Sequence, residues 1–348
     1  MTSDVSDGPG ADRSTGRLSR VPGEQPRSGR GPAVVALGGG HGLSASLGAL
    51  RLMTDRITAV VTVADDGGSS GRLRAELDVL PPGDLRMALS ALCDDTDWGR
   101  TWRDVLQHRF ASDGPLDQHA VGNLLIVALW ELLGDPVAGL DWVGRLLGAR
   151  GRVLPMSQLP LEIEADMVLD GVETLVQGQS AVAGARGEVN AIRLHPAEPP
   201  ACPEAVAAIA AADWVVLGPG SWFTSVLPHV RVPELYEALR STPARRCVTL
   251  NLRPPGDPTA MTNLQHLRAL AAHAPDLRVD VVVADPSAVV HLDELNEQAA
   301  SMGAQLVLRQ VSAGDGTARH DTLRLAAAYR DAFESAWGDL GSAPGMAG

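Results

Sequence analysis

Apolar positions recur along this chain with two spacings. Short runs of β-branched and aliphatic residues that stop at glycine or aspartate are typical of strands buried on both faces of a parallel sheet. They predict strands at residues 33–37, 57–64, 214–217, 246–250, 279–283 and 305–309. Longer stretches with apolar residues three and four apart are typical of amphipathic helices. They predict helices at residues 44–52, 84–93, 98–110, 123–133, 203–212, 264–273, 292–301 and 321–337. This alternation predicts an α/β fold with a Rossmann-like, doubly wound and mostly parallel sheet.

Residues 152–195 interrupt the alternation of strands and helices. Apolar and polar residues alternate here at 161–169, 174–177 and 189–194, and Gly171 is a turn signal between the first two runs. Such alternation is typical of strands with one solvated face. We therefore expect a small, mostly β insert at about 152–195.

The two ends of the chain differ from the rest in composition. Residues 1–31 are rich in glycine, serine, proline and arginine and nearly free of apolar residues, and residues 339–348 are similar. Segments of this kind cannot bury enough apolar surface to offset the entropy of ordering. We expect disordered tails at both ends and one folded domain at 32–338.

Composition and charge exclude several classes of function. The chain has 348 residues, of which 45% are hydrophobic, and its net charge is −13. That charge argues against a general nucleic-acid or membrane-surface binder. All 29 basic residues are arginine. Without lysine there is neither a Schiff-base lysine nor a complete Walker A loop, which excludes pyridoxal enzymes and ordinary P-loop kinases.

Cysteines and apolar runs indicate the compartment. Cys93, Cys202 and Cys247 lie far apart, so no spacing suggests a metal knuckle or a redox motif. The N-terminus lacks the apolar stretch of a signal peptide. The longest apolar run, 124–133, contains Glu131 and is too short to span a bilayer. We expect a cytoplasmic protein that neither inserts into a membrane nor binds nucleic acid.

The first candidate binding loop directly follows the first predicted strand. It consists of Gly38, Gly39, Gly40, His41, Gly42 and Leu43. Glycines let a ligand approach the backbone N–H groups closely, and the N-terminus of the next helix adds partial positive charge. Both favour a phosphate. The alternative is a tight turn without a ligand, because Leu43 stands where a G-x-G-x-x-G motif has its third glycine.

A second candidate loop follows the next predicted strand. It consists of Asp65, Asp66, Gly67, Gly68, Ser69, Ser70 and Arg72. Ligands of open α/β sheets bind outside the carboxyl ends of strands. Two carboxylates there could bind ribose hydroxyls, or a Mg²⁺ ion at Asp65 and Asp66. We expect a flexible loop whose N–H groups, hydroxyls and Arg72 guanidinium contact a phosphate. A solvated turn is the alternative.

Three further polar residues lie near predicted helix starts. Asp84 fits the N-cap of the helix that follows it, and it could also face a ligand. Asn123 could cap its helix or offer its amide to a ligand. His119 is a candidate general base, although a lone histidine is more often structural.

A last candidate loop repeats the glycine pattern of the first. It follows the strand at 214–217 and contains Gly218, Pro219, Gly220, Ser221 and Thr224, with Ser221 as a candidate N-cap. Two such loops in one sheet predict a ligand held between two halves of the sheet.

Five runs in this order, GGGHGLS, VTVADDGGSSGRLR, PPGDLR, HAVGNLL and LGPGSWFTSV, resemble the YvcK family of bacterial proteins. These are also called gluconeogenesis factors and belong to the CofD-like superfamily. The resemblance runs from about Val34 to the terminal helix. It implies a Rossmann-like fold and binding of a UDP-sugar, UDP-N-acetylglucosamine in particular. It also implies regulation of cell shape and peptidoglycan synthesis during gluconeogenic growth, without a settled reaction. We further expect cell-wall synthesis proteins as partners, and a homo-oligomer.

The chain departs from the family pattern at several positions. His41 stands where the family has threonine. Residues 255–257, Pro-Gly-Asp, resemble a family element that follows a strand ending at Asn251. An ungapped match from there places Met261 where many members carry a ligand-contacting tyrosine. Asn251 and Met261 are therefore candidate ligand residues, and the sugar and base preference stay open.

Three functions compete on the sequence. The first is a regulator that senses a nucleotide-sugar. The second is a CofD-type enzyme that transfers 2-phospho-L-lactate to a deazaflavin acceptor, with Asp65 and Asp66 as candidate catalytic residues that hold Mg²⁺. The third is a dinucleotide-dependent oxidoreductase, against which the broken G-x-G-x-x-G spacing counts.

Overall fold

The computed structural model of the chain describes residues 30–254 and 260–338. The expected tails therefore lie outside the described residues, except for Arg30 and Gly31. The Pro-Gly-Asp element at 255–257 also lies outside them.

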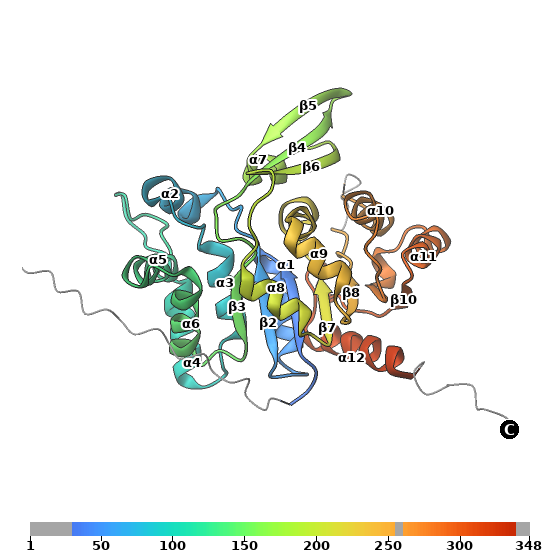
Figure 1. Ribbon diagram of the computed structural model, residues 1–348, viewed down its shortest axis with the longest axis horizontal. Coiled ribbons are helices and arrows are strands. Elements are labelled where there is room, and N and C mark those ends of the chain that lie inside the picture. Colours follow the sequence, from blue (N-terminus) through green and yellow to red (C-terminus); the bar gives the residue numbers. More distant parts are fainter. Residues whose placement is uncertain (1–29, 255–259, 339–348) are drawn as a thin grey trace, which may run out of the picture.

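A seven-stranded sheet forms the centre of the molecule (Figure 1). Its strands are β1 (Val34–Gly38), β2 (Ile57–Val61), β3 (Arg152–Pro155), β7 (Trp214–Leu217), β8 (Arg245–Thr249), β9 (Val281–Ala284) and β10 (Gln305–Leu308). They lie in the order β10-β9-β8-β7-β1-β2-β3, and every neighbouring pair is parallel. The predicted α/β class and parallel sheet are confirmed, because the apolar runs are buried on both faces.

The direction of winding reverses between β1 and β7. From β1 the chain adds β2 and β3 on one side, and from β7 it adds β8, β9 and β10 on the other. Val34 is in register with Ile57 of β2 and with Trp214 of β7, so β1 lies at the centre of both halves. Open α/β sheets bind ligands where the strand order reverses, outside the carboxyl ends of the strands. We call that side of the sheet the carboxyl edge.

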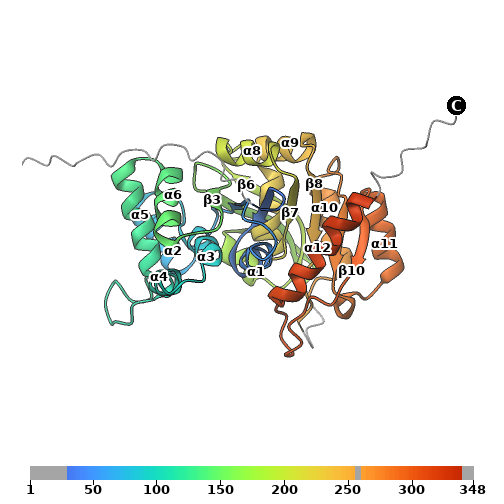
Figure 2. The same ribbon diagram turned by 90° about the horizontal axis from the view of Figure 1, so that it is seen from below.

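Helices cover both faces of the sheet. In chain order they are α1 (Gly40–Leu50), α2 (Gly68–Leu77), α3 (Gly83–Leu92), α4 (Asp97–Gln107), α5 (Val121–Leu133), α6 (Pro136–Leu147), α8 (Pro203–Ala210), α9 (Pro233–Ser241), α10 (Asn263–His273), α11 (Leu292–Ser301) and α12 (Thr322–Gly338). Figure 2 shows α1, α3 and α12 on one face and α8 and α9 on the other. None of the helices in the described part of the chain has the length and apolar content to cross a membrane.

The insert lies at the carboxyl edge as a separate antiparallel sheet (Figure 1). It contains β4 (Glu162–Leu169), β5 (Val172–Gln177), the short helix α7 (Gln179–Gly184) and β6 (Glu188–His195), with strand order β5-β4-β6. The expected start at residue 152 is wrong, because β3 pairs with β2 in the main sheet. Val153 and Leu154 are buried on both faces of the main sheet. The insert therefore begins after Pro155.

Two helices begin inside segments that the sequence predicts as loops. α1 begins at Gly40 rather than at residue 44, so four residues of the expected glycine loop form its first turn. The expected flexible loop after Asp66 is instead α2, which begins at Gly68. Glycine and serine disfavour a helix by propensity. Here Ser69, Ser70 and Leu73 are buried, and tertiary packing outweighs that propensity.

A buried hydroxyl relay ties α12 to the centre of the sheet. The Ser46 hydroxyl in α1 donates to the Gly218 carbonyl at 3.0 Å. Because its only proton is used there, the Tyr329 hydroxyl of α12 must donate to Ser46, at 2.7 Å. Thr249 of β8 then donates to Tyr329 at 3.0 Å. One side chain of α12 thus supports the turn at Gly218.

Replacing Tyr329 by Phe should lower the free energy of unfolding by about 1–3 kcal/mol, because the buried Ser46 and Thr249 hydroxyls both lose their hydrogen bond to Tyr329. Urea denaturation measures this. The matched control is Tyr236→Phe, whose hydroxyl only accepts an N–H bond from the exposed Asp276. Equal losses in the two variants would contradict the relay.

Candidate functional site

The two glycine turns meet at the point where the strand order reverses. A Cβ atom on Gly42 would lie 2.2 Å from the Pro219 carbonyl oxygen and 2.4 Å from the Gly220 Cα. Such distances leave no room for a side chain, so only glycine allows this approach of the two backbones. The structure thus brings together the first and last candidate loops.

The first glycine turn exposes the N-terminus of α1. Gly39 occupies the N-cap and has no side chain to cap this end, while the Asp84 carboxylate accepts the backbone N–H of Gly40. Gly40 has φ +56°, which a residue with a side chain adopts at a cost. A helix end of this kind presents free N–H donors and partial positive charge to an anion. His41 is exposed in this first turn, whereas Leu43 is buried in the core and is not available to a ligand.

Asp84 lies beside this helix end. Its expected role as an N-cap is wrong, because α3 begins at Gly83 and Pro82 occupies the cap position. A Cβ atom on Gly39 would lie 2.3 Å from the Asp84 Oδ2 atom, so the carboxylate packs against the glycine turn. Burial, and secondly the charge of Asp65, raise the pKa of Asp84 from 3.8 to about 7, although the Gly40 backbone amide favours the charged form.

The two adjacent aspartates of the second loop diverge. The Asp65 Oδ1 atom accepts the Gly67 N–H at 3.0 Å, and the charge of Asp65 acts on Asp84. The Asp66 Oδ1 atom instead accepts the backbone N–H and the hydroxyl of Ser180, at 2.9 and 2.5 Å, at the start of α7. Asp65 thus faces the site with Asp84, while Asp66 holds the insert.

Other polar residues of the second loop lie in α2 and bind neighbouring segments. The Ser69 hydroxyl is buried, lies 3.0 Å from the His119 Nδ1 atom and accepts the Asn123 amide at 3.0 Å. Asn123 is not an N-cap, since Ala120 holds that position in α5. Burial lowers the pKa of His119, and its contact in the described residues is with Ser69. Arg72 donates to the carbonyls of residues 115 and 117, away from the glycine turns.

The remaining residues of this loop lie closer to the carboxylates. Ser70 is buried, and its hydroxyl would lie 2.3 Å from a Cβ atom on Gly83. Gly67 is the N-cap of α2, and Gly68 has φ +48° with open space around it. The loop therefore contributes Asp65 and Ser70 to the site, and its other polar groups hold neighbouring segments.

Asn251 fixes the second glycine turn. Its Oδ1 atom accepts the Gly220 N–H at 2.9 Å and its Nδ2 atom donates to the Gly220 carbonyl at 2.7 Å. Both polar atoms of Asn251 are used, so its action on a ligand would pass through Gly220. Met261, also a predicted ligand residue, is half-buried and packs against the core.

The chain after the second glycine turn is not an α-helix. Residues Trp222–Val226 form a π-helical turn and residues Leu227–Arg231 a 3-10 turn. Ser221 stands at the cap position but accepts only the Thr224 hydroxyl, at 2.5 Å. The expected second helix end is therefore wrong, because Pro228 lacks the N–H that a continuing helix needs. This turn offers the exposed Ser221 hydroxyl rather than a helix dipole.

Replacing Asn251 by Ala should weaken nucleotide binding at least tenfold and lower the free energy of unfolding by about 1–2 kcal/mol, because both Gly220 backbone groups lose their partners. Titration of the variant with a UDP-sugar measures the first effect. Asn296→Ala, on the exposed side of α11, is the control and should bind like the wild type. Unchanged binding in Asn251→Ala would exclude a role for the Gly220 turn.

The oxygen atoms near Asp84 are those a hard cation prefers. Asp65 and Asp84 supply carboxylates, and the Thr62 hydroxyl oxygen is buried with no hydrogen-bond partner among the described residues. A Cβ atom on Gly39 would lie 2.6 Å from the Thr62 Cγ2 atom and 2.3 Å from the Asp84 Oδ2 atom, so these groups adjoin. Among the described residues, no cluster of three or more His, Cys, Asp or Glu side chains could hold a metal ion. Sequence reasoning missed Thr62, because a lone threonine after a strand carries no signal.

Comparisons with known proteins show which family this chain resembles. The family model described as 2-phospho-L-lactate transferase CofD matches residues 34–317. A protein of Mycobacterium tuberculosis (strain H37Rv) named "Putative gluconeogenesis factor" is 52% identical over 304 residues, covering 84% of this chain and 88% of that protein. The "Gluconeogenesis factor" of Bacillus subtilis (strain 168) is 33% identical over 318 residues, covering 87% and 98%. The crystal structure of a upf0052 family member from Bacillus halodurans matches with a TM-score of 0.76 and 32% identity, covering 86% and 98%.

Proposed function

This chain belongs to the CofD family, among relatives named as gluconeogenesis factors, and from that premise we propose that it is a regulator that binds a UDP-sugar. The observation that carries the proposal is the contact between the two glycine turns at the strand-order reversal. A diphosphate can lie over this contact, with the N–H groups of the α1 N-terminus on one side and the Gly218–Ser221 turn on the other.

A divalent cation fits the same place. We propose that Mg²⁺ would be held by Asp65 and Asp84, with the Thr62 hydroxyl close by, rather than by Asp65 and Asp66. Asp66 is less suited because Ser180 donates two hydrogen bonds to one of its oxygens. A bound cation would neutralise phosphate charge and would make the ionised form of the half-buried Asp84 favourable.

The regulatory role rests on the relatives rather than on the geometry. Two curated relatives carry gluconeogenesis factor in their names. We propose UDP-N-acetylglucosamine as the ligand, control of cell shape and peptidoglycan synthesis during gluconeogenic growth as the role, and cell-wall synthesis proteins as partners. The insert is suited to report ligand binding, because Asp66 in the loop next to the site holds the start of α7.

The test is a thermal-shift panel of nucleotide-sugars with Mg²⁺, followed by phosphorus NMR of the best ligand over hours. We expect stabilisation by UDP-N-acetylglucosamine and an unchanged phosphorus spectrum. Stabilisation by none of the nucleotides would refute the binding proposal, and steady conversion would refute the regulator in favour of an enzyme.

The second candidate is a CofD-type transferase. The Asp65–Asp84 carboxylate pair favours it, because such a pair can hold the metal of phospho-group transfer. It predicts that a deazaflavin acceptor receives 2-phospho-L-lactate from an activated donor, and that Asp84→Asn abolishes the product. Liquid chromatography of the acceptor decides between the two candidates.

A further inference from the structure

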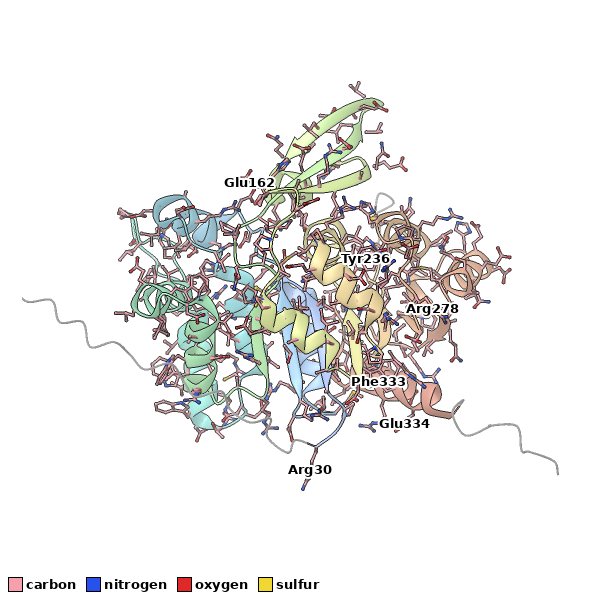
Figure 3. All side chains as sticks on the ribbon, viewed as in Figure 1. Arg30, Glu162, Tyr236, Arg278, Phe333 and Glu334 are labelled. Carbon is pink, nitrogen blue, oxygen red and sulfur yellow. The ribbon has the colours of Figure 1, made fainter. Side chains whose placement is uncertain are left out.

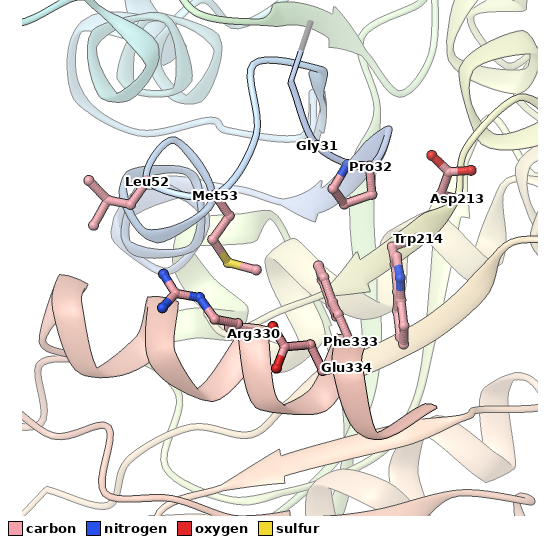
Figure 4. A pocket seen from close by; sticks show the side chains of 9 residues that line it. All are labelled: Gly31, Pro32, Leu52, Met53, Asp213, Trp214, Arg330, Phe333 and Glu334. Carbon is pink, nitrogen blue, oxygen red and sulfur yellow. The ribbon is translucent and has the colours of Figure 1, made fainter. Parts of the chain in front are cut away.

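A cavity of about 700 Å³ lies at the edge of the sheet opposite to the glycine turns (Figure 4). Its apolar wall is formed by Leu52 and Met53 after α1, by Trp214 at the start of β7, and by Phe333 of α12. Phe333 stacks on Trp214 at a centroid distance of 4.1 Å, which gives this wall a rigid aromatic floor. In Figure 3, Phe333 and Glu334 lie far from Glu162 of the insert, so the cavity is separate from the proposed nucleotide site.

Two opposite charges lie beside the aromatic floor. Arg330 and Glu334 line the cavity one helical turn apart on α12, and the Glu334 carboxylate lies between Arg330 and Phe333 (Figure 4). Both side chains are exposed, and within the described residues neither side chain has a hydrogen bond or an ion pair. Asp213, also at the rim, is engaged instead, because it accepts the Ala33 N–H at 2.7 Å. The charges open to an occupant are therefore one cation and one anion.

We propose that this cavity is a second ligand site, which binds a small zwitterion with an apolar body, such as an apolar amino acid or dipeptide. Its carboxylate would pair with Arg330, its ammonium group with Glu334, and its apolar side chains would lie between Met53 and Phe333. The volume lies within the ~300–1,000 Å³ range of small-molecule sites. The carboxylate of a fatty acid would lie close to Glu334, and the ammonium group of a simple amine would lie close to Arg330. Both are repulsive contacts between like charges, so a zwitterion matches the two side chains best.

The two helices that support the glycine turns also contribute residues to the cavity or lead into it. α1 starts at the first glycine turn, and the residues after its end line the cavity. α12 supplies Arg330 and Phe333 to the cavity and, next to them, Tyr329, whose hydroxyl leads through Ser46 to Gly218. An occupant would touch the elements that position the nucleotide site without touching the nucleotide, which is the arrangement of an effector site.

The experiment titrates the full-length protein with L-leucyl-L-phenylalanine by calorimetry and ligand-observed NMR. The N-acetyl form lacks the ammonium group and the C-terminal amide lacks the carboxylate, so each probes one charge. Leu52→Trp, at a side chain that is 52% exposed, fills the cavity mouth with little effect on folding. Leu323→Trp, at a 71% exposed position on α12, is the matched control.

We expect saturable binding of the dipeptide by the wild type and by Leu323→Trp. Binding should weaken at least tenfold for either capped form with the wild type, and for the free dipeptide with Leu52→Trp, Arg330→Gln or Glu334→Gln. No binding to the wild type, equal binding of the capped forms, or full binding by Leu52→Trp would overturn the proposal. Binding that needs removal of residues 1–29 would also overturn it, since the cavity would then belong to the chain's own N-terminal residues. None of these results depends on whether a UDP-sugar binds.

Discussion

Replacing Gly42 by Ala should abolish UDP-sugar binding and lower the free energy of unfolding by about 1–3 kcal/mol, which is the usual cost of overpacking. The new Cβ atom would lie 2.2 Å from the Pro219 carbonyl oxygen and 2.4 Å from the Gly220 Cα. Both obstacles are backbone atoms, so no side-chain rotation relieves the clash. The two glycine turns must separate, and a diphosphate then loses one of its two supports.

The control for this variant lies in the same helix. Gly48 has room for a methyl group, since the nearest atom to its Cβ would be 3.6 Å away on Thr322. Gly48→Ala should bind ligand normally and gain up to ~1 kcal/mol, because alanine has the higher helix propensity. Calorimetric titration and urea denaturation of both variants give the comparison. Ligand binding by Gly42→Ala at wild-type affinity would show that the contact between the turns does not form the site.

Asp84→Asn should stabilise the protein at pH 8 and leave it nearly unchanged at pH 4.5. Burial and the charge of Asp65 raise the pKa of Asp84 from 3.8 to about 7. A folded-state pKa above the unfolded value means that the neutral form stabilises the fold at low pH, and that this contribution is lost as the pH rises from about 4 through 7. At about 1.4 kcal/mol per pKa unit, the loss at pH 8 amounts to a few kcal/mol. Asparagine resembles the neutral acid, so the variant does not lose this stability at pH 8.

The measurement is thermal unfolding of the wild type and Asp84→Asn between pH 4.5 and 8, with Asp293→Asn on the exposed side of α11 as the control. The difference in unfolding temperature between Asp84→Asn and the wild type should increase with rising pH. Added Mg²⁺ should reduce this difference in part, because a cation beside Asp84 stabilises the ionised form. The same variant should bind a UDP-sugar poorly when Mg²⁺ is present. A difference in stability that does not depend on pH would contradict the raised pKa of Asp84.

The sequence predicts the sheet better than it predicts the helix ends. β-branched runs such as the one at β2 are buried on both faces, and that burial leaves a clear pattern. Helices that begin in glycine-rich segments leave no such pattern in the sequence, because the local helix propensity there is low. α1 and α2 begin at Gly40 and Gly68, where contacts from other segments stabilise turns that the sequence alone disfavours.

The sequence predicts in part which residues form the site, but it does not predict which of them contact one another. Glycine turns after two strands, and a carboxylate after a third, follow from local pattern. The partners come from distant segments: the charge of Asp65 acts on Asp84, Asn251 binds Gly220, and Asp66 binds Ser180. Even the adjacent Asp65 and Asp66 bind different segments, since Asp65 accepts the Gly67 N–H and Asp66 accepts the Ser180 N–H. Only the fold fixes such pairs.

Calorimetric titration of the full-length wild type with UDP-N-acetylglucosamine, in the presence of Mg²⁺ at neutral pH, tests the central claim most directly. We predict saturable binding near one ligand per chain, which Gly42→Ala loses and Gly48→Ala keeps. Absence of binding by the wild type, or equal binding by all three proteins, would contradict a UDP-sugar site formed by the two glycine turns.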